Sequence, residues 1–239
     1  KNKKNLQDLI NFKYNNNNNE YNKLLIRIYI NPLIDLLKRN NQNNNHFIYS
    51  GGDTHTDSDN QNYGLSKIRV TNTKKNIIII KSFEKNRHWG NVSFNFDKLK
   101  FKDKLNKVIW RGTTTGTEGI GSRFDLVTSF FNKIDNIDVG FSSICQNKEK
   151  YRKYIKNSMK IKDLLKYKYI ISVEGNDKDS GLNWKLNSNS VVFMRKPTKV
   201  SWLMESLLIP NYHYILLNDD FSNLEEKYNW CIKNEEKCQ

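Results

Sequence analysis

From about residue 106 onward, short apolar runs alternate with amphipathic stretches along the chain. The apolar runs are typical of buried strands, and the stretches between them repeat their apolar positions with the period of a helix. The five expected strands span residues 108–110, 137–141, 167–173, 191–194 and 212–217. The expected helices span residues 122–132, 159–166, 181–187, 202–208 and 223–234. This alternation predicts an α/β fold with a parallel, doubly wound sheet, whose strand-to-helix loops all lie at one edge.

The N-terminal part of the chain has a less regular pattern. Residues 21–38 predict a helical hairpin in which Pro32 breaks or starts a helix. Asparagine-rich tracts at residues 15–19 and 40–45 flank this hairpin and are typical of loops.

Two further short strands are predicted at residues 46–50 and 77–81. Together with the regular alternation later in the chain, they predict two Rossmann-like lobes, of which the N-terminal one is reduced. Residues 1–105 would form this reduced lobe and residues 106–222 the regular one. Residues 223–239 would add a C-terminal helix that packs back on the first lobe.

Lysine and asparagine are abundant, and the formal net charge is +15. Codon bias alone explains this composition if the lysines lie on solvated faces. Two functional explanations stay open, namely attraction of anionic substrates such as nucleotide sugars and binding of nucleic-acid phosphates. The basic run at residues 148–168 is interrupted by apolar residues at helical spacing, which indicates the outside of packed helices.

Three cysteines, Cys145, Cys231 and Cys238, form neither a disulfide framework nor a zinc pattern. Cys231 and Cys238 could pair, but reduced thiols are expected. No apolar run approaches the ~18 residues of a membrane span, and no signal peptide is visible. We therefore expect a cytoplasmic protein without a membrane span.

One loop with candidate chemistry follows the strand at residues 108–110. Arg111, Gly112 and Thr113 lead through a threonine- and glycine-rich turn to Ser122, a candidate N-cap, and Arg123. Free N–H groups at a helix N-terminus bind anions, and arginine side chains bind phosphate in a bidentate manner. The pattern indicates a phosphate site, and the alternative is an ordinary capped loop. It is not a P-loop, because Gly-Lys-Ser/Thr is absent.

A second candidate loop runs from residue 173 to residue 185 at the same expected sheet edge. It contains Gly175, and Ser180 is the expected N-cap of the next helix. Asn183 and Lys185 can face a diphosphate or a sugar.

Acidic residues offer further candidates with plain structural alternatives. Asp177 and Asp179 mimic an Asp-x-Asp metal motif, but such triplets are common in a highly charged chain, and we expect no metal site. Glu205, near an expected helix start, can accept both ribose hydroxyls, or it is a surface carboxylate. Asp53, beyond an expected strand, can deprotonate an acceptor hydroxyl, or it belongs to a common turn.

An ordered series of motifs over roughly residues 46–222 resembles the CAP10-like glycosyltransferases (glycosyltransferase family 90). That family includes the protein O-glucosyltransferases and the fungal capsule xylosyltransferases. The series begins with Trp110-Arg111-Gly112, a threonine and a later arginine. It continues through residues 168–214, KYIISVEGNDKDSGLNWKLNSNSVVFMRKPTKVSWLMESLLIPNYHY.

The resemblance implies a GT-B-type arrangement of two Rossmann-like lobes. It also implies an inverting, metal-independent glycosyltransferase that needs no cofactor beyond its donor. The donor would be a UDP-sugar (glucose, xylose or a related sugar), and the acceptor a hydroxyl of a glycan or a protein.

Position by position, the resemblance places Asp53 on the catalytic aspartate, although the family's Arg-Asp-Tyr-like surroundings are absent. Thr113 falls on the family's Ser/Thr, and Arg123 falls on its phosphate-binding arginine. Asn183 stands where members often carry an arginine, so Lys185 could substitute for that contact. The segment before Trp-Arg-Gly is shortened, and residues 87–90 are candidates for the remaining sugar-facing loop.

Two other functions stay open. A basic nucleic-acid-binding module would use the positive charge and the aromatic residues, but no recognised nucleic-acid motif is present, so this partner is not expected. A catalytically inactive lobe that still binds a sugar or a protein would fit the reduced N-terminal region.

Overall fold

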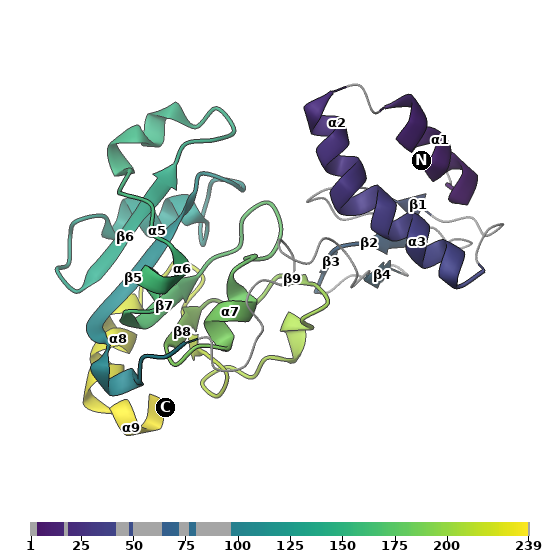
Figure 1. The fold of residues 1–239 in the computed structure, drawn as a ribbon. Helices are drawn as coiled ribbons and strands as arrows, with labels where there is room; N and C mark the ends of the chain where they lie inside the picture. The colour runs from purple at the N-terminus through teal and green to yellow at the C-terminus, as the bar shows by residue number, and fades with distance from the viewer. Residues whose placement is uncertain are drawn as a thin grey trace. The chain divides into compact units, whose positions relative to one another are not determined.

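The computed structural model describes residues 4–16, 19–41, 48–49, 64–71, 77–79 and 97–238. The chain divides into two compact units, whose elements Figure 1 labels. Unit 1 comprises Lys1–Gly90 and Thr198–Ser206, and unit 2 comprises Asn91–Pro197 and Leu207–Gln239. Each unit has its own sheet and its own hydrophobic core.

Unit 1 begins with two helical stretches. The first is α1 (Leu6–Asn15), which starts in a capping box formed by Asn5 and Asp8. The second is continuous and consists of α2 (Glu20–Leu25), a π-helical segment (Ile26–Ile30) and α3 (Asn31–Arg39). The core between them contains Leu6, Leu9, Ile26, Ile28, Tyr29, Ile30, Leu33, Ile34 and Leu37.

The hairpin expected within residues 21–38 is wrong, because this stretch does not turn. Pro32 has no N–H to donate and would break a regular helix. Here it lies in the first turn of α3, directly after the π-helical segment, where Asn31 N–H donates to the Ile26 carbonyl one residue further back than in an α-helix. The helix therefore continues past the proline and packs on α1.

The strands of unit 1 are short. A parallel sheet has the order β1-β2-β4, with β1 Ile48–Tyr49, β2 Gly64–Ser66 and β4 Ile77–Ile79. A separate antiparallel pair joins β3 (Arg69–Val70) to β9 (Lys199–Val200). Both strands expected in this region exist, with narrower bounds.

Unit 2 is built on a five-stranded parallel sheet with the order β10-β8-β7-β5-β6. The strands are β5 (Leu105–Thr113), β6 (Ile137–Ser143), β7 (Tyr167–Ser172), β8 (Val191–Met194) and β10 (Ile215–Leu216). The predicted α/β class and parallel sheet are confirmed, while the two-lobed GT-B arrangement stays a prediction. After β6 the chain returns to the other side of β5, so the strand order reverses between β5 and β7. Ligands of open α/β sheets bind beyond the carboxyl ends of the strands at such a switch point.

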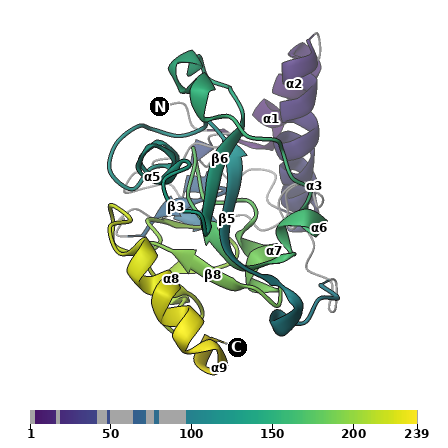
Figure 2. The same ribbon diagram turned by 90° about the vertical axis from the view of Figure 1, so that its left-hand side faces the viewer.

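Helices cover both faces of this sheet, as Figure 2 shows. On one face, α5 (Arg123–Phe130) and α8 (Leu224–Lys233) bury Phe124 and Tyr228 with Val108 and Trp110. On the other face, α6 (Ile161–Leu164) and α7 (Leu182–Leu186) pack with Ile109 and Ile170. Residues 108–110 thus alternate between the two faces with the period of a strand.

Shorter helices complete the part of the chain that the structure describes. They are 3-10 turns at Phe101–Asp103, Glu149–Tyr154 and Glu205–Leu207, and the C-terminal α9 (Glu235–Cys238). The helix expected at residues 202–208 is wrong, since only the single turn at Glu205–Leu207 forms. Ser201 holds the Glu205 carboxylate, and Met204 has a left-handed φ of 57°, which a regular helix does not accept.

No helix in the described ranges combines the length and the apolar character that crossing a membrane requires.

Candidate functional site

A cleft of about 270 Å³ lies at the switch point between β5 and β7 of unit 2. We call it the β5–β7 cleft. Its walls come from the carboxyl end of β5, from β7, from the start of α5 and from the loop that enters α7. The lining residues are Trp110, Arg111, Gly112, Thr113, Arg123, Ser142, Leu164, Ile170, Ile171, Asp179, Ser180, Gly181, Trp184 and Lys185.

Six of the residues singled out from the sequence therefore meet in one cleft, namely Arg111, Gly112, Thr113, Arg123, Ser180 and Lys185. Gly175 does not line it but lies against the Arg123 side chain. Asn183 is buried within α7 and is not part of the lining. Glu205 belongs to unit 1, and Asp53 and residues 87–90 lie outside the described residues.

Arg123 is the first residue of α5, whose N-cap Ser122 accepts a hydrogen bond from the Asp125 amide. One terminal nitrogen of its guanidinium, Nη1, donates to the Thr115 hydroxyl at 2.6 Å and to the Thr113 carbonyl at 3.2 Å. The other, Nη2, donates to the Val173 carbonyl at 3.4 Å. The Nε atom is buried and has no hydrogen-bond partner among the described residues.

Burial lowers the pKa of the Arg123 guanidinium, and the Asp179 and Asp177 carboxylates oppose this effect. The group still carries its charge, because arginine keeps its proton in proteins. No carboxylate forms a salt bridge with it in the described part of the chain. A buried cation with an unused N–H, at the positive end of a helix, attracts an anion into the cleft.

The Asp179 carboxylate is held inside the cleft by three groups. It accepts hydrogen bonds from the Lys185 ammonium, from the Ser172 hydroxyl at 2.7 Å and from the Gly181 amide at 2.9 Å. Burial alone would raise the pKa of Asp179. The Lys185 charge and the hydrogen bonds from Lys185 and Ser172 have the larger combined effect and lower the pKa to about 2. Asp179 is therefore ionised and paired at neutral pH.

Two expectations for this loop change with that geometry. Ser180 is not the N-cap of α7, since Gly181 takes that position and its amide is satisfied by Asp179. Lys185 donates to Asp179 and, at 3.0 Å, to the Ile171 carbonyl, so its charge is already balanced within the protein.

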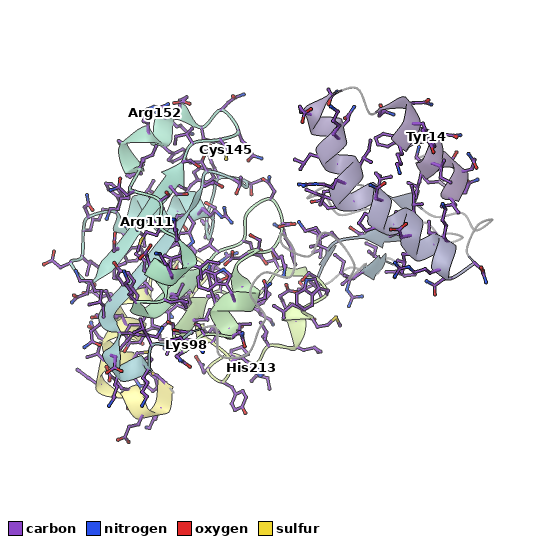
Figure 3. The ribbon with its side chains drawn as sticks, in the orientation of Figure 1. Tyr14, Lys98, Arg111, Cys145, Arg152 and His213 are labelled. Carbon is purple, nitrogen blue, oxygen red and sulfur yellow. The ribbon has the colours of Figure 1, made fainter. Side chains whose placement is uncertain are left out.

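Arg111 connects neighbouring strands, and Figure 3 labels it on β5. Its Nη2 binds the Asp138 carboxylate on β6 at 2.8 Å, and its Nη1 donates to the Asp138 and Trp110 carbonyls. The Nε atom donates to the Asn157 carbonyl at 3.3 Å. Burial raises the pKa of Asp138, while Arg111 and Lys156 outweigh it, and the net shift is downward. Each of the three nitrogens of the Arg111 guanidinium thus donates within the protein, whereas the Arg123 Nε has no partner among the described residues.

Glycine at position 112 leaves room for the Trp110 ring close to the end of the strand. A Cβ at this position would come within 2.6 Å of the indole ring. The same indole lies 5.9 Å from the Arg123 guanidinium, within the range of a cation–π contact. Gly112 therefore shapes the wall of the cleft without contacting a ligand through a side chain.

The loop after β5 is fixed on both sides of Thr115. The Thr114 hydroxyl donates to the Cys145 carbonyl at 2.9 Å and accepts from the Cys145 amide at 2.8 Å. Figure 3 labels Cys145 in the loop beyond β6. The Gly116 amide donates to the Asn176 side chain at 2.8 Å.

Further along, Glu118 binds Lys148, Lys150 and Tyr151, and these hydrogen bonds lower the pKa of Glu118 to about 2.

Sequence reasoning missed Thr115, Ser172 and the pairing of Asp179. Thr115 lies in the same Thr-Thr-Thr-Gly run as Thr113, so its hydroxyl was an equal candidate on sequence grounds. Asp179 was considered only as a metal ligand. The described residues contain no group of three or more His, Cys, Asp and Glu side chains arranged to hold a metal ion.

Glu205 lies in unit 1 and is buried, not on the surface. Its two carboxylate oxygens accept from the Ser201 amide at 2.6 Å and from the Ser201 hydroxyl at 2.7 Å. This arrangement closes a turn in the chain. A contact of Glu205 with a ribose stays a prediction.

Comparison with known proteins shows which family model and which relatives the chain is similar to. The family model described as "Glycosyl transferase family 90" matches residues 47–239. The chain is 32% identical over 158 residues to the O-glucosyltransferase LpsA of Dichelobacter nodosus. The aligned region covers 66% of this chain and 46% of LpsA. It therefore spans less than half the length of that relative.

Two viral proteins are also similar. Uncharacterized protein 179R of Invertebrate iridescent virus 6 is 35% identical over 80 residues, covering 31% of this chain and 7% of the viral protein. Uncharacterized protein 035R of Invertebrate iridescent virus 3 is 26% identical over 166 residues, covering 62% of this chain and 15% of that protein.

Proposed function

The chain belongs to glycosyl transferase family 90, and from this premise we propose that it transfers a sugar from a UDP-sugar to a hydroxyl of a glycan or protein acceptor. The β5–β7 cleft would hold the diphosphate of the donor. LpsA is named as an O-glucosyltransferase, which makes glucose the first sugar to test, ahead of xylose and related sugars.

The observation that carries this proposal is the state of Arg123. Its guanidinium is charged and has a buried Nε–H without a protein partner among the described residues. It lies at the N-terminus of α5 and at the switch point of a parallel sheet. A diphosphate would supply both the negative charge and the acceptor oxygens that this position lacks.

The donor's leaving group determines what Arg123 does in the reaction. Negative charge develops on the diphosphate as the bond to the anomeric carbon breaks. The Arg123 charge and the amides at the start of α5 would stabilise that charge, and the Thr113 hydroxyl would donate to a phosphate oxygen. These groups take the role that a metal has in other transferases, which supports a metal-independent reaction.

The attack on the anomeric carbon requires a base. We propose Asp53, on the strength of the family resemblance alone, since it lies outside the described residues. It would take the proton of the acceptor hydroxyl, which then attacks from the face opposite UDP. One such displacement inverts the anomeric configuration.

Calorimetric titration of UDP, with GDP and CDP as controls, tests the proposal. Each titration is run once with EDTA and once with Mn²⁺. The proposal predicts that UDP binds and that binding survives EDTA. Binding only with Mn²⁺ would contradict metal independence. Binding of none of the three nucleotides would contradict the function, and the basic surface would then be tested against nucleic acid in a salt series.

A further inference from the structure

We infer that Thr115 and Gly175 position Arg123, so that the edge of its guanidinium formed by Nε and Nη2 faces the phosphate site. This inference rests on the proposed function, because it concerns the same anion. Neither residue would contact the sugar or the reacting atoms, and both would act through the arginine.

The hydrogen bonds of Arg123 are distributed unevenly over its guanidinium. Nη1 has two N–H groups, and both are used, by Thr115 at 2.6 Å and by Thr113 at 3.2 Å. Nε has no protein partner in the described ranges, and Nη2 makes only a long bond of 3.4 Å to Val173. The donors that are left therefore belong to the Nε–Nη2 edge, whose parallel N–H groups match two oxygens of a phosphate.

Thr115 makes the shortest of these bonds, so it contributes most to the orientation of the guanidinium. Its hydroxyl is itself fixed in place by the bonds on either side of it. Thr114 is bound to Cys145, and the Gly116 amide is bound to Asn176. The loop thus presents the Thr115 oxygen before any ligand arrives, which lowers the entropic cost of ordering the arginine.

Gly175 supplies the space for this contact. A Cβ at position 175 would lie 2.9 Å from Arg123 Nη2, 3.0 Å from its Cζ and 2.9 Å from Thr115 Oγ1. These distances are shorter than van der Waals contact, so an alanine would push the guanidinium and the hydroxyl apart. A glycine here therefore lets the arginine and the threonine meet.

The inference makes Thr115→Val and Thr115→Ser an informative pair. Valine keeps the shape of threonine and removes the oxygen, while serine keeps the oxygen. Thr117→Val is the matched control, since Thr117 is an exposed threonine of the same loop. Gly175→Ala tests the steric half of the inference independently, and Thr115→Ala replaces the valine variant if that one does not fold.

The experiment is calorimetric titration of each full-length variant with UDP and with uridine, after its melting temperature is recorded. The loss of one hydrogen bond to a charged group predicts about 10- to 100-fold weaker UDP binding for Thr115→Val. Uridine binding should stay the same, because only the diphosphate contacts Arg123. A general structural loss would weaken both ligands equally. Thr115→Ser and Thr117→Val should bind UDP within about threefold of the wild type, and Gly175→Ala should resemble Thr115→Val.

The outcomes separate this inference from the proposed function. If the wild type binds UDP and Thr115→Val binds it equally well, the positioning role is overturned and the proposed function stands. Equal losses of UDP and uridine binding would also overturn the positioning role. If the wild type binds no UDP, the proposed function fails, and the inference fails with it.

Discussion

The Asp179 carboxylate and the Lys185 ammonium form a buried ion pair at the carboxyl end of β7, with side chains only 12% and 7% exposed. The pair connects the loop before α7 to the helix itself and, through Ser172, to the strand. It also keeps one negative charge close enough to influence Arg123. The charges around the donor site are thus arranged before a ligand binds.

Replacement of Asp179 by asparagine should destabilise unit 2. Lys185 would keep its charge in a buried site without its carboxylate partner, which typically costs about 3–5 kcal/mol of unfolding free energy. Urea unfolding followed by circular dichroism measures this loss. Asp163→Asn is the control, because Asp163 pairs with Lys166 at the surface and its loss should change stability little. Equal stability of Asp179→Asn and the wild type would contradict the structural role of the pair.

The same pair predicts how stability depends on pH. The pKa of Asp179 is about 2 in the folded protein, against an ordinary value of 3.8. A lowered pKa means that the ionised carboxylate stabilises the fold at pH values above about 4, and that this contribution disappears as pH falls from about 4 to about 2. The stability difference between the wild type and Asp179→Asn should therefore narrow over that range. A difference that stays constant from pH 6 to pH 3 would argue against the ion pair.

Lys104 forms a second buried ion pair, at the amino ends of the strands. Its ammonium binds the Asp97 carboxylate at 2.7 Å, the Ser190 hydroxyl at 3.0 Å and the Leu165 carbonyl. Burial lowers the pKa of Lys104, and the Asp97 contact opposes this shift. The pair fixes the segment before β5 to the start of β8.

Lys104→Met should leave the Asp97 carboxylate buried without its cation and cost about 3–5 kcal/mol of unfolding free energy. Lys102→Met, two residues earlier and exposed, is the matched control and should leave stability nearly unchanged. The urea unfolding midpoints of both variants, compared with that of the wild type, measure these changes in stability. UDP affinity of the folded Lys104→Met protein should stay at the wild-type value, because Lys104 does not line the cleft.

Asp53→Asn tests the proposed base separately from the donor site. Removal of a general base should lower kcat by about 10²- to 10⁴-fold, while the affinity for UDP stays unchanged. Sugar transfer from UDP-glucose, monitored through the UDP released, measures kcat. Calorimetric titration measures the affinity for UDP. Asp57→Asn, from the same segment, is the control. Unchanged turnover of Asp53→Asn would assign the base to another residue.

The sequence predicted those elements that are determined by neighbouring residues, such as an apolar run or a helix cap. The residues of β8 form an unbroken apolar run, and its expected bounds at residues 191–194 agree with the structure. The start of α5 was predicted from Ser122, whose side chain accepts the expected capping hydrogen bond from the Asp125 amide. The expected parallel sheet likewise follows from the alternation of such segments, and it placed the candidate loops at one edge.

What the sequence could not predict involves partners that are distant in sequence or local backbone geometry. The phosphate contact expected of Arg111 stays a prediction, but its ion pair with Asp138 on β6 was not foreseen, because the register of β5 and β6 sets that pairing. The helix expected at residues 202–208 carries apolar periodicity, yet the Ser201–Glu205 contact and the left-handed Met204 replace it with one turn. Neither register nor backbone strain can be read from the spacing of apolar residues.

The most direct test of the account compares UDP binding by the wild type and by Arg123→Ala in the presence of EDTA. We predict metal-free binding by the wild type and a loss of about 2–4 kcal/mol of UDP binding free energy in Arg123→Ala, which corresponds to a fall in affinity of roughly 30- to 1,000-fold. Arg152→Ala, which removes an exposed arginine of unit 2, should bind like the wild type. A folded Arg123→Ala protein that binds UDP as tightly as the wild type would contradict the assignment of the donor site to the β5–β7 cleft.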